Sequence, residues 1–250
     1  MIRTTILFLA FLFFGNALFA QVTDTLRKRE ANGDEFLQLV RDKKMIAEGT
    51  IHNGLKEGVW TEYWENKVPH YVAAYHQGKK NGIFINIRRT GNVENVNYYH
   101  NDLQDGPSRR FNIGAGIAEE GYYSDGVRSG SFSKWYENGN LQEQSNYNHN
   151  VRDGLTSYFM ENGTKIAEYN YDRGKLEGDA TIYHENGRVK EFGNFTNDEQ
   201  SGTWKEYYSD GILKAEGKYV HGEKDGVWKQ FDEKGKPTAS IVYKNGKPKA

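Results

Sequence analysis

The chain has 250 residues, with 33 lysines and arginines against 34 aspartates and glutamates and a formal net charge of −1. This balance is unlike that of a basic nucleic-acid-binding domain, and an aromatic content of 14% excludes a disordered chain, which would be poor in aromatic residues. There is no cysteine, which excludes a disulfide framework and lipoprotein anchoring through an N-terminal cysteine.

Residues 1–20, MIRTTILFLAFLFFGNALFA, predict a secretory signal peptide. Arg3 supplies the positive charge, and an apolar run covers residues 6–14 before a segment with small residues. Because this run is short for a membrane span of about 20 residues, we favour cleavage over an uncleaved signal anchor. Cleavage after Ala20, or alternatively after Ala17, leaves a mature chain without a transmembrane span. We expect this chain to be exported to the periplasm, the cell surface or the medium.

Residues 21–44 precede the regular part of the chain and carry many charges. Phe36, Leu37 and Val40 have i, i+1, i+4 spacing, which suits a short amphipathic helix. A loose leader and an N-terminal cap are equally consistent with this composition.

The rest of the chain, residues 45–250, is built from a repeat of 24 residues, and internal repeats of this kind determine the fold. A partial repeat at residues 45–53 precedes eight full repeats at residues 54–245 and a tail at residues 246–250. Eight glycines mark the period: Gly58, Gly82, Gly106, Gly130, Gly154, Gly178, Gly202 and Gly226.

Other columns keep the same register as these glycines. The residues four positions earlier are all Gly, Asn or Asp, which tolerate positive φ in turns. Five positions after each glycine the residue is aromatic in every copy except Ile87, and 17 positions after it the residue is aromatic in all eight copies. A tryptophan or phenylalanine stands two positions after the glycine in five copies: Trp60, Phe84, Phe132, Trp204 and Trp228.

Each unit predicts two antiparallel strands, as in residues 203–209 and 212–220. Asp210-Gly211 between them predicts a two-residue type I′ turn, as do Asn-Gly pairs in other units, because both positions of that turn need φ > 0. Such a turn places Trp204 opposite Gly217, where a residue without a side chain leaves room for the indole. The whole pattern predicts an all-β protein of tandem antiparallel hairpins.

Two further expectations concern the aromatic columns and the third unit. The aromatic residues five positions after the glycine have the opposite parity from the tryptophans, so both faces of the sheet are expected to carry aromatic rows. In the third unit Pro107 follows the glycine and Gly114-Ala115-Gly116 replaces the Asn-Gly pair, so a kink or weaker pairing is expected there.

The unit G-x(3)-G-x-W-x(2)-Y/F-x(3)-G-x(7)-Y resembles the MORN repeat, and more closely its variant in bacterial YwqK-type proteins. Gly222-Glu-Lys-Asp-Gly226-Val-Trp228-Lys-Gln-Phe231 carries this resemblance, which extends over about residues 45–246. The resemblance implies an elongated single-layer antiparallel meander sheet of tandem 24-residue hairpins, and a scaffold rather than an enzyme. YwqK-type proteins are labelled antitoxins of toxin–antitoxin systems, and an export signal would separate this chain from a cytosolic toxin.

No hydrolase, metalloprotease, Walker or dinucleotide motif occurs, so we expect no catalytic residue, no cofactor and no metal site. His76 and His100 are one repeat apart, which is too far for one tetrahedral ion. The aromatic residues are the best candidates for binding, although stacking on one another is the simpler interpretation. The candidate interaction surface is Trp64, Trp135, Tyr136, Tyr207 and Tyr208, of which Trp64 and Tyr208 are expected to be the more exposed.

These observations favour an exported, non-enzymatic repeat scaffold that binds a protein partner at the cell envelope. The alternatives are an envelope glycan-binding module that uses exposed tryptophans and tyrosines, and a YwqK-type antitoxin.

Overall fold

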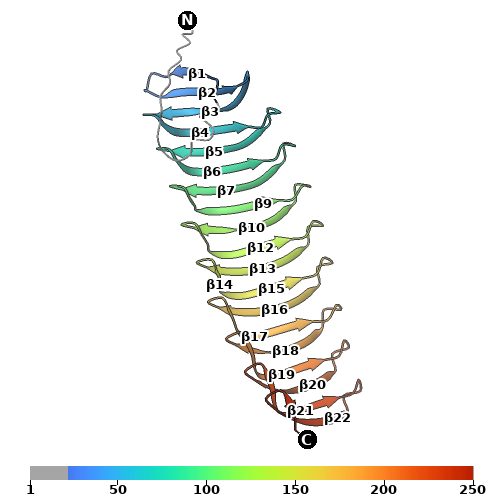
Figure 1. Ribbon diagram of the computed structural model, residues 1–250. Helices are drawn as coiled ribbons and strands as arrows, with labels where there is room; N and C mark the ends of the chain where they lie inside the picture. The colour runs from blue at the N-terminus through green and yellow to red at the C-terminus, as the bar shows by residue number, and fades with distance from the viewer. Residues whose placement is uncertain (1–21, 250) are drawn as a thin grey trace. The chain divides into compact units, whose positions relative to one another are not determined.

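The computed structural model describes residues 22–249 (Figure 1). The chain divides after Ala115 into two compact units. The predicted signal peptide lies outside the described residues. Every regular element in residues 22–249 is a β-strand, and within each unit the strands pair antiparallel with their neighbours in sequence. The predicted all-β meander of hairpins is therefore confirmed.

The first unit contains nine strands: β1 (Asp24–Arg29), β2 (Glu35–Arg41), β3 (Lys44–His52), β4 (Leu55–Tyr63), β5 (Pro69–His76), β6 (Lys79–Ile87), β7 (Val93–His100), β8 (Leu103–Gln104) and β9 (Gly106–Phe111). The second unit begins with β10 (Ile117–Ser124), β11 (Val127–Arg128), β12 (Gly130–Trp135), β13 (Leu141–Asn148), β14 (Val151–Arg152), β15 (Gly154–Phe159) and β16 (Lys165–Asp172). It continues with β17 (Lys175–Tyr183), β18 (Val189–Thr196), β19 (Glu199–Tyr207), β20 (Leu213–Val220), β21 (Glu223–Phe231), β22 (Pro237–Lys244) and β23 (Lys247–Pro248).

The segment before the repeats is a hairpin of β1 and β2, and β2 in turn pairs with β3. The helical interpretation of Phe36, Leu37 and Val40 is thus wrong. Leu37 and Leu39 are buried against Ala47 and Trp60, and their i, i+2 spacing is the period of a strand. Phe36 and Val40 lie on the other face, so the apparent helical spacing mixed residues from the two faces.

Adjacent repeats are joined by two-residue turns in which both residues have positive φ, as at His221 (φ 51) and Gly222 (φ 75). The column four positions before the repeat glycine has positive φ in all eight copies, as its composition predicts. The repeat glycines themselves also have positive φ, from 67 at Gly58 to 115 at Gly106. In most copies they accompany a register shift, as between Phe192 and Asn194, so the invariant glycine supplies the backbone conformation of a β-bulge.

The turn within each repeat is in the predicted place but is not a type I′ turn. Only Gly211 of the pair Asp210-Gly211 has positive φ, and the register steps from Tyr207 to Leu213. The amide of Gly211 donates to the carbonyl of Tyr208 at 2.9 Å, and the amide of Ile212 donates to the carboxylate of Asp210 at 3.0 Å. The side chain of Asp210 therefore stabilises a three-residue loop with one left-handed glycine.

Tryptophans and glycines on neighbouring strands form interlocking pairs, and we call the face that carries them the ladder face. Trp204 is opposite Gly217 as predicted, but its indole lies over Gly193 on the preceding strand, and Gly217 accommodates Trp228 instead. The β-bulge at the repeat glycine explains the difference. It shifts the register between β18 and β19 at Gly193, so that the Trp204 ring lies over Gly193. A Cβ added at Gly193 would lie 2.2 Å from the indole.

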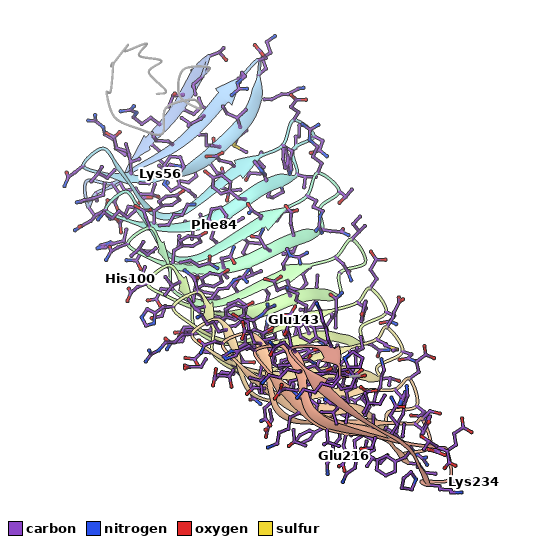
Figure 2. All side chains as sticks on the ribbon, turned by 60° about the horizontal axis from the view of Figure 1, so that its bottom comes forward. Lys56, Phe84, His100, Glu143, Glu216 and Lys234 are labelled. Atoms are coloured by element: carbon purple, nitrogen blue, oxygen red, sulfur yellow. The ribbon has the colours of Figure 1, made fainter. Side chains whose placement is uncertain are left out.

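The aromatic rings of the ladder face contact one another edge to face. In the second unit Phe195, Trp204, Tyr219, Trp228 and Tyr243 follow at centroid distances of 5.4, 5.8, 5.2 and 6.4 Å. These separations favour the ring quadrupoles, so the rings stabilise the sheet by stacking on each other. Side chains also project from the other face of the strands, which we call the open face (Figure 2).

The irregular third unit has its strand interrupted at Asp105, between β8 and β9. The same interruption occurs at Ser129 and Asp153 in the next two units, which lack a proline at that place. Pro107 is therefore not its cause. Ala115 in the third unit has a φ of 64, in the turn position that glycine occupies in other copies.

Candidate functional site

The open face of β17, β18 and β19 carries an aromatic group that belongs to no ladder. Thr181, Phe192 and Lys205 are register partners on these three strands and so share the face opposite Trp204. Phe192 is 40% exposed, although it lies in the middle of its strand. An uncovered ring in the interior of a sheet marks this place as a candidate contact surface.

Two hollows open beside Phe192, at the end of the strands where the within-repeat turns lie. One has a volume of about 650 Å³ and is lined by Phe192, Tyr183 and Tyr207, with Arg188 and Asp210 from the adjacent turns. Tyr183 and Tyr207 therefore lie on the open face, which confirms that both faces carry aromatic residues. The aromatic floor and charged rim suit a ligand with both apolar and charged groups.

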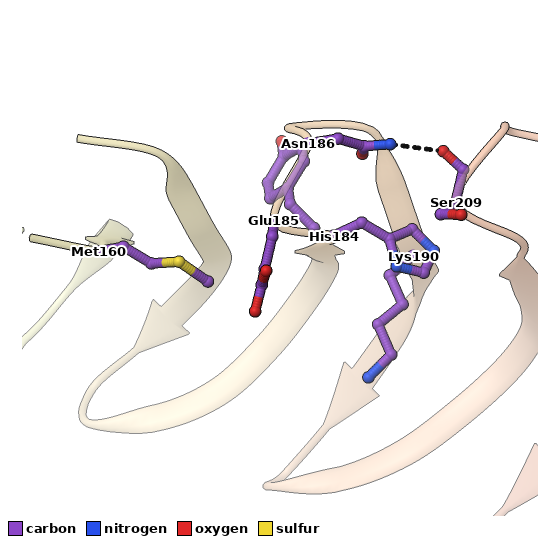
Figure 3. A pocket seen from close by; sticks show the side chains of 7 residues that line it. Met160, His184, Glu185, Asn186, Lys190 and Ser209 are labelled. Carbon is purple, nitrogen blue, oxygen red and sulfur yellow. Dashed lines mark hydrogen bonds between the residues drawn. The ribbon is translucent and has the colours of Figure 1, made fainter. Parts of the chain in front are cut away.

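The second hollow, of about 460 Å³, shares Tyr183 with the first (Figure 3). Its walls include Met160, His184, Asn186 and Lys190. Turn-to-turn hydrogen bonds hold these walls: the Asn186 amide donates to the carbonyl of Ser209 at 2.6 Å, and the His184 ring bonds the carbonyl of Tyr207 at 2.9 Å. The hollows therefore have backbone-anchored sides.

Tyr183 is fixed by a carboxylate on its own face. Its hydroxyl donates to Glu168 at 2.7 Å. Partial burial and this hydrogen bond to Glu168 raise the pKa of Tyr183 to about 12. Burial alone would raise the pKa of Glu168, but the bonds from Lys165 and Tyr183 outweigh it and hold that pKa below its usual value. The ring in the hollow is consequently neutral and oriented at physiological pH.

Cations gather on the open face next to these rings. By strand alternation this face carries Lys190, Lys205, Lys214, Lys218 and Lys229. It also carries Glu216 and, toward the strand ends away from the hollows, Glu177, Asp179, Glu199, Glu223 and Asp225. Lys229 is 3.6 Å from Glu216, and Lys218 is the register partner of Asp225. Within residues 22–249, Lys205 and Lys214 have no carboxylate at ion-pair distance.

The predicted surface residues are less exposed than expected, since all five are partly buried. The Trp64 indole donates to the carbonyl of Ile87 at 2.8 Å and stacks on His70 with a 3.7 Å centroid distance. Tyr136 and Tyr208 donate to the carbonyls of Phe159 and Phe231, each at 2.9 Å.

Trp64 and Tyr208, expected to be the more exposed of the five, are thus partly buried and hydrogen-bonded. Both occupy the column six positions after the repeat glycine, and each donates to a backbone carbonyl of the next repeat. Trp135 ends β12 with its ring partly buried. Tyr207 is the predicted residue that lines a hollow.

Sequence reasoning missed Phe192 and the lysines around it. The signal was present, because Phe192 is the one aromatic residue in a column that otherwise holds Val72, Val96, Glu120, Gln144, Glu168, Glu216 and Ser240. Lys190 and Lys214 are likewise the two cations of their column. Residues such as Phe192 depart from the pattern that the repeats share, so the shared pattern does not indicate them.

The ladder face offers less access. Trp60, Trp204 and Trp228 are at most 2% exposed, and cations cover several rings. The ammonium of Lys224 lies 3.9 Å from the Trp228 ring centre, and that of Lys56 4.6 Å from the Trp60 ring. These are cation–π contacts that close the ladder.

A polar cluster interrupts the ladder on β12 to β15. Glu143 is 8% exposed and accepts hydrogen bonds from Ser145 at 2.5 Å, Arg152 at 2.5 Å and Lys134 at 3.1 Å. Burial alone would raise its pKa, but these donors outweigh burial and lower the pKa of Glu143 to about 2. The guanidinium of Arg152 lies 6.0 Å from the Tyr147 ring and 5.7 Å from the Tyr171 ring, so it bridges two rings where other repeats place a tryptophan.

Residues 22–249 contain no group of three or more His, Cys, Asp or Glu side chains able to hold a metal ion. The same residues include no helix with the length and apolarity needed to cross a bilayer.

The family model described as MORN repeat variant matches residues 128–149, 200–221 and 224–245. These three segments of the chain are similar to MORN repeat variants. Each match covers most of one 24-residue period, and together they include β12–β13, β19–β20 and β21–β22. A comparison with curated proteins gives no match.

Among solved structures, the chain is similar to a mutant of S. aureus TarM crystallised with Fondaparinux, alpha-GlcNAc-glycerol and UDP. The identity is 10%, the alignment covers 59% of this chain and 22% of that one, and the TM-score is 0.18. The chain thus spans about a fifth of the length of that protein.

Proposed function

We propose that this protein is an exported, non-enzymatic scaffold whose MORN-variant repeats bind a protein partner at the cell envelope. The observation that carries the proposal is the division of labour between the two faces of the sheet. The ladder face is closed by its own side chains, through stacked rings or through the polar cluster around Glu143, whereas the open face exposes Phe192 beside Lys205, which has no carboxylate at ion-pair distance within residues 22–249.

Export rests on the signal-peptide pattern of residues 1–20. It is tested by fractionating cells that produce the full chain and determining the N-terminal residue of the mature protein. A mature protein that begins after Ala17 or Ala20 in the periplasm, surface or medium supports export. Full-length protein in the cytoplasm contradicts it and favours the YwqK-type antitoxin instead.

Partner binding is tested by photo-cross-linking in intact cells. A photoreactive amino acid is placed at Phe192 on the open face, and a matched control carries it at Val59, an exposed open-face residue of the other unit. We expect a discrete protein adduct from position 192 that is weaker or absent from position 59. If neither position gives a protein adduct, the protein does not bind a partner through this face, and the proposal is contradicted.

A glycan-binding module is the second candidate. Sugar rings stack on exposed aromatic faces, and the buried, cation-covered tryptophans of the ladder do not offer such faces. The hollow with Tyr183 and Tyr207 retains that chemistry. Binding of purified envelope polysaccharide that Tyr207→Ala abolishes would favour the glycan.

A further inference from the structure

We infer that the open face of β17 to β21 binds a proline-rich segment of a partner protein that carries an acidic residue at every third position. This inference rests on the proposed scaffold function and specifies which surface acts and what it recognises.

The first argument is an alternation of rings and cations along one side of the open face. Tyr183, Tyr207 and Phe231 occupy the same repeat position on β17, β19 and β21. Lys190 and Lys214 occupy one repeat position on the strands between them, β18 and β20. Lys190 lines the same hollow as Tyr183, and the Lys214 ammonium lies 5.9 Å from the ring of Tyr208, next to Tyr207.

The second argument is spacing. Equivalent residues of successive repeats are two strands apart, which is about 9.6 Å at roughly 4.8 Å per strand. A polyproline II helix has three residues per turn and rises about 3.1 Å per residue, so every third side chain points the same way at intervals of about 9.3 Å. Acidic groups at that interval therefore match Lys190 and Lys214 without distorting either partner.

The third argument is the chemistry of the hollows. Proline rings pack on aromatic side chains, and aromatic-lined grooves are a general means of recognising the preformed polyproline II helix. The 650 Å³ hollow presents Tyr183, Phe192 and Tyr207 together. The carboxylate of Asp210 at its rim is held by the amide of Ile212 in the turn at 3.0 Å, and Glu185 lies at the turn tip of the second hollow.

The lysines next to the rings favour an acidic occupant. Lys205 and Lys214 lack a carboxylate at ion-pair distance among the described residues, and Lys190 has only Glu191, at 3.5 Å. An acidic ligand would supply the missing countercharge.

The test uses a fluorescein-labelled peptide of five Pro-Pro-Glu triplets and the mature protein, with fluorescence anisotropy as the measurement. Three probes are compared with it: five Pro-Pro-Lys triplets, a peptide of Pro-Pro-Pro-Glu quartets, and heparin as an anionic polysaccharide. We expect saturable binding of the Pro-Pro-Glu peptide, weakened by salt because exposed charges are screened. The Lys peptide should not bind, and the quartet peptide and heparin should bind more weakly.

Lys190→Glu and Lys214→Glu should each weaken peptide binding by roughly fivefold, the size of one exposed ion pair. Lys79→Glu, the same change at an exposed lysine of the first unit, should leave binding unchanged. Tyr207→Ala should weaken binding as well, with circular dichroism confirming that each variant keeps its sheet content. Equal binding of the triplet and quartet peptides, or binding of heparin alone, would overturn the inference.

Failure of the inference can be told apart from failure of the scaffold function. If the cross-linked adduct at position 192 persists in the Lys190→Glu, Lys214→Glu double variant while the peptide does not bind, the scaffold function stands and the recognition mode is wrong. If the adduct is absent from the unaltered protein as well, the scaffold function itself fails.

Discussion

Gly193→Ala should destabilise the second unit severely, because the new methyl group would overlap an indole. The added Cβ would lie 2.2 Å from Cδ2 of Trp204, whereas carbon atoms pack at about 3.5–4.0 Å. Trp204 is 1% exposed and cannot swing into solvent without leaving the ladder. The indole must therefore move by roughly 1 Å or more, or the strands must separate.

The expected cost combines several terms. Overpacking of a tight core costs about 1–3 kcal/mol. Displacement of the ring also weakens its edge contacts with Phe195 and Tyr219, each worth about 0.5–1.5 kcal/mol. The bond from the Trp204 indole to the carbonyl of Asn194, at 3.1 Å, adds about 1 kcal/mol when lost. These terms sum to about 3–7 kcal/mol, and because the edge contacts are weakened rather than lost, we expect a destabilisation of about 3–5 kcal/mol.

Denaturant unfolding followed by tryptophan fluorescence measures the effect, and hydrogen exchange localises it. Repeat arrays need not unfold in one step, so faster exchange in β18, β19 and β20 is the more direct readout. Gly114→Ala is the matched control, because its added Cβ meets nothing closer than an Asn112 oxygen at 3.5 Å and its φ is not positive. That change should be near neutral.

A double-mutant cycle decides whether the ring is the cause. Trp204→Thr alone should cost about 3–5 kcal/mol as a large-to-small core change. In the Gly193→Ala, Trp204→Thr double variant the clash is gone. Its loss of stability should therefore be about 3 kcal/mol smaller than the sum of the losses of the two single variants. The same chain already contains such a pair, since Ser145 and Thr156 occupy the equivalent columns. Additive costs, or wild-type exchange rates in Gly193→Ala, would refute the reasoning.

Two further changes test the polar cluster and the links between repeats. The pKa of Glu143 is lowered from 4.5 to about 2, so the stability that its ion pairs confer is present above pH 4.5 and is lost as pH falls from about 4.5 to 2. This contribution is about 3 kcal/mol at neutral pH. Glu143→Gln should therefore flatten the pH dependence of the unfolding midpoint between about pH 4.5 and 2. An unchanged pH dependence in that range would contradict this prediction. Tyr208→Phe should cost about 1 kcal/mol in thermal unfolding by leaving the Phe231 carbonyl without its donor, whereas Tyr122→Phe, at a 49% exposed ring, should be silent. Equal midpoints for these two variants would show that the bond between repeats contributes nothing.

The sequence was sufficient to predict the repeat, the antiparallel hairpins and the positive φ of the column four positions before the repeat glycine. Glycine at Gly226 and glycine or aspartate at the turn column report backbone conformations that few other residues adopt, so their spacing transfers directly to structure. The prediction of a type I′ turn at Asp210-Gly211 was wrong, because the dipeptide alone does not determine the register in which the two flanking strands pair. That depends on the bulge between Glu206 and Tyr207, which forms only when the strands pair.

The binding surface was harder to predict for a different reason. Trp64 and Tyr208 each stand beside a structural aromatic residue, and this pattern predicts that they are the more exposed of the candidate residues. Their polar atoms instead satisfy carbonyls of the next repeat, at Ile87 and Phe231. Whether a ring faces solvent depends on contacts 23 residues away in sequence, which no local pattern contains.

Comparison between repeats of this one chain separates structural from functional positions. On the ladder face, changes are compensated: Gly193 faces Trp204, and where the repeat has Ala180 in place of the tryptophan, its register partner is the bulky Tyr169. A position whose variation is balanced by its neighbour serves packing. On the open face, Phe192 is the one aromatic residue of its column, and its register partners Thr181 and Lys205 do not cover it. An uncompensated change that leaves a ring exposed has no packing benefit, so an external ligand is the simplest physical reason for it.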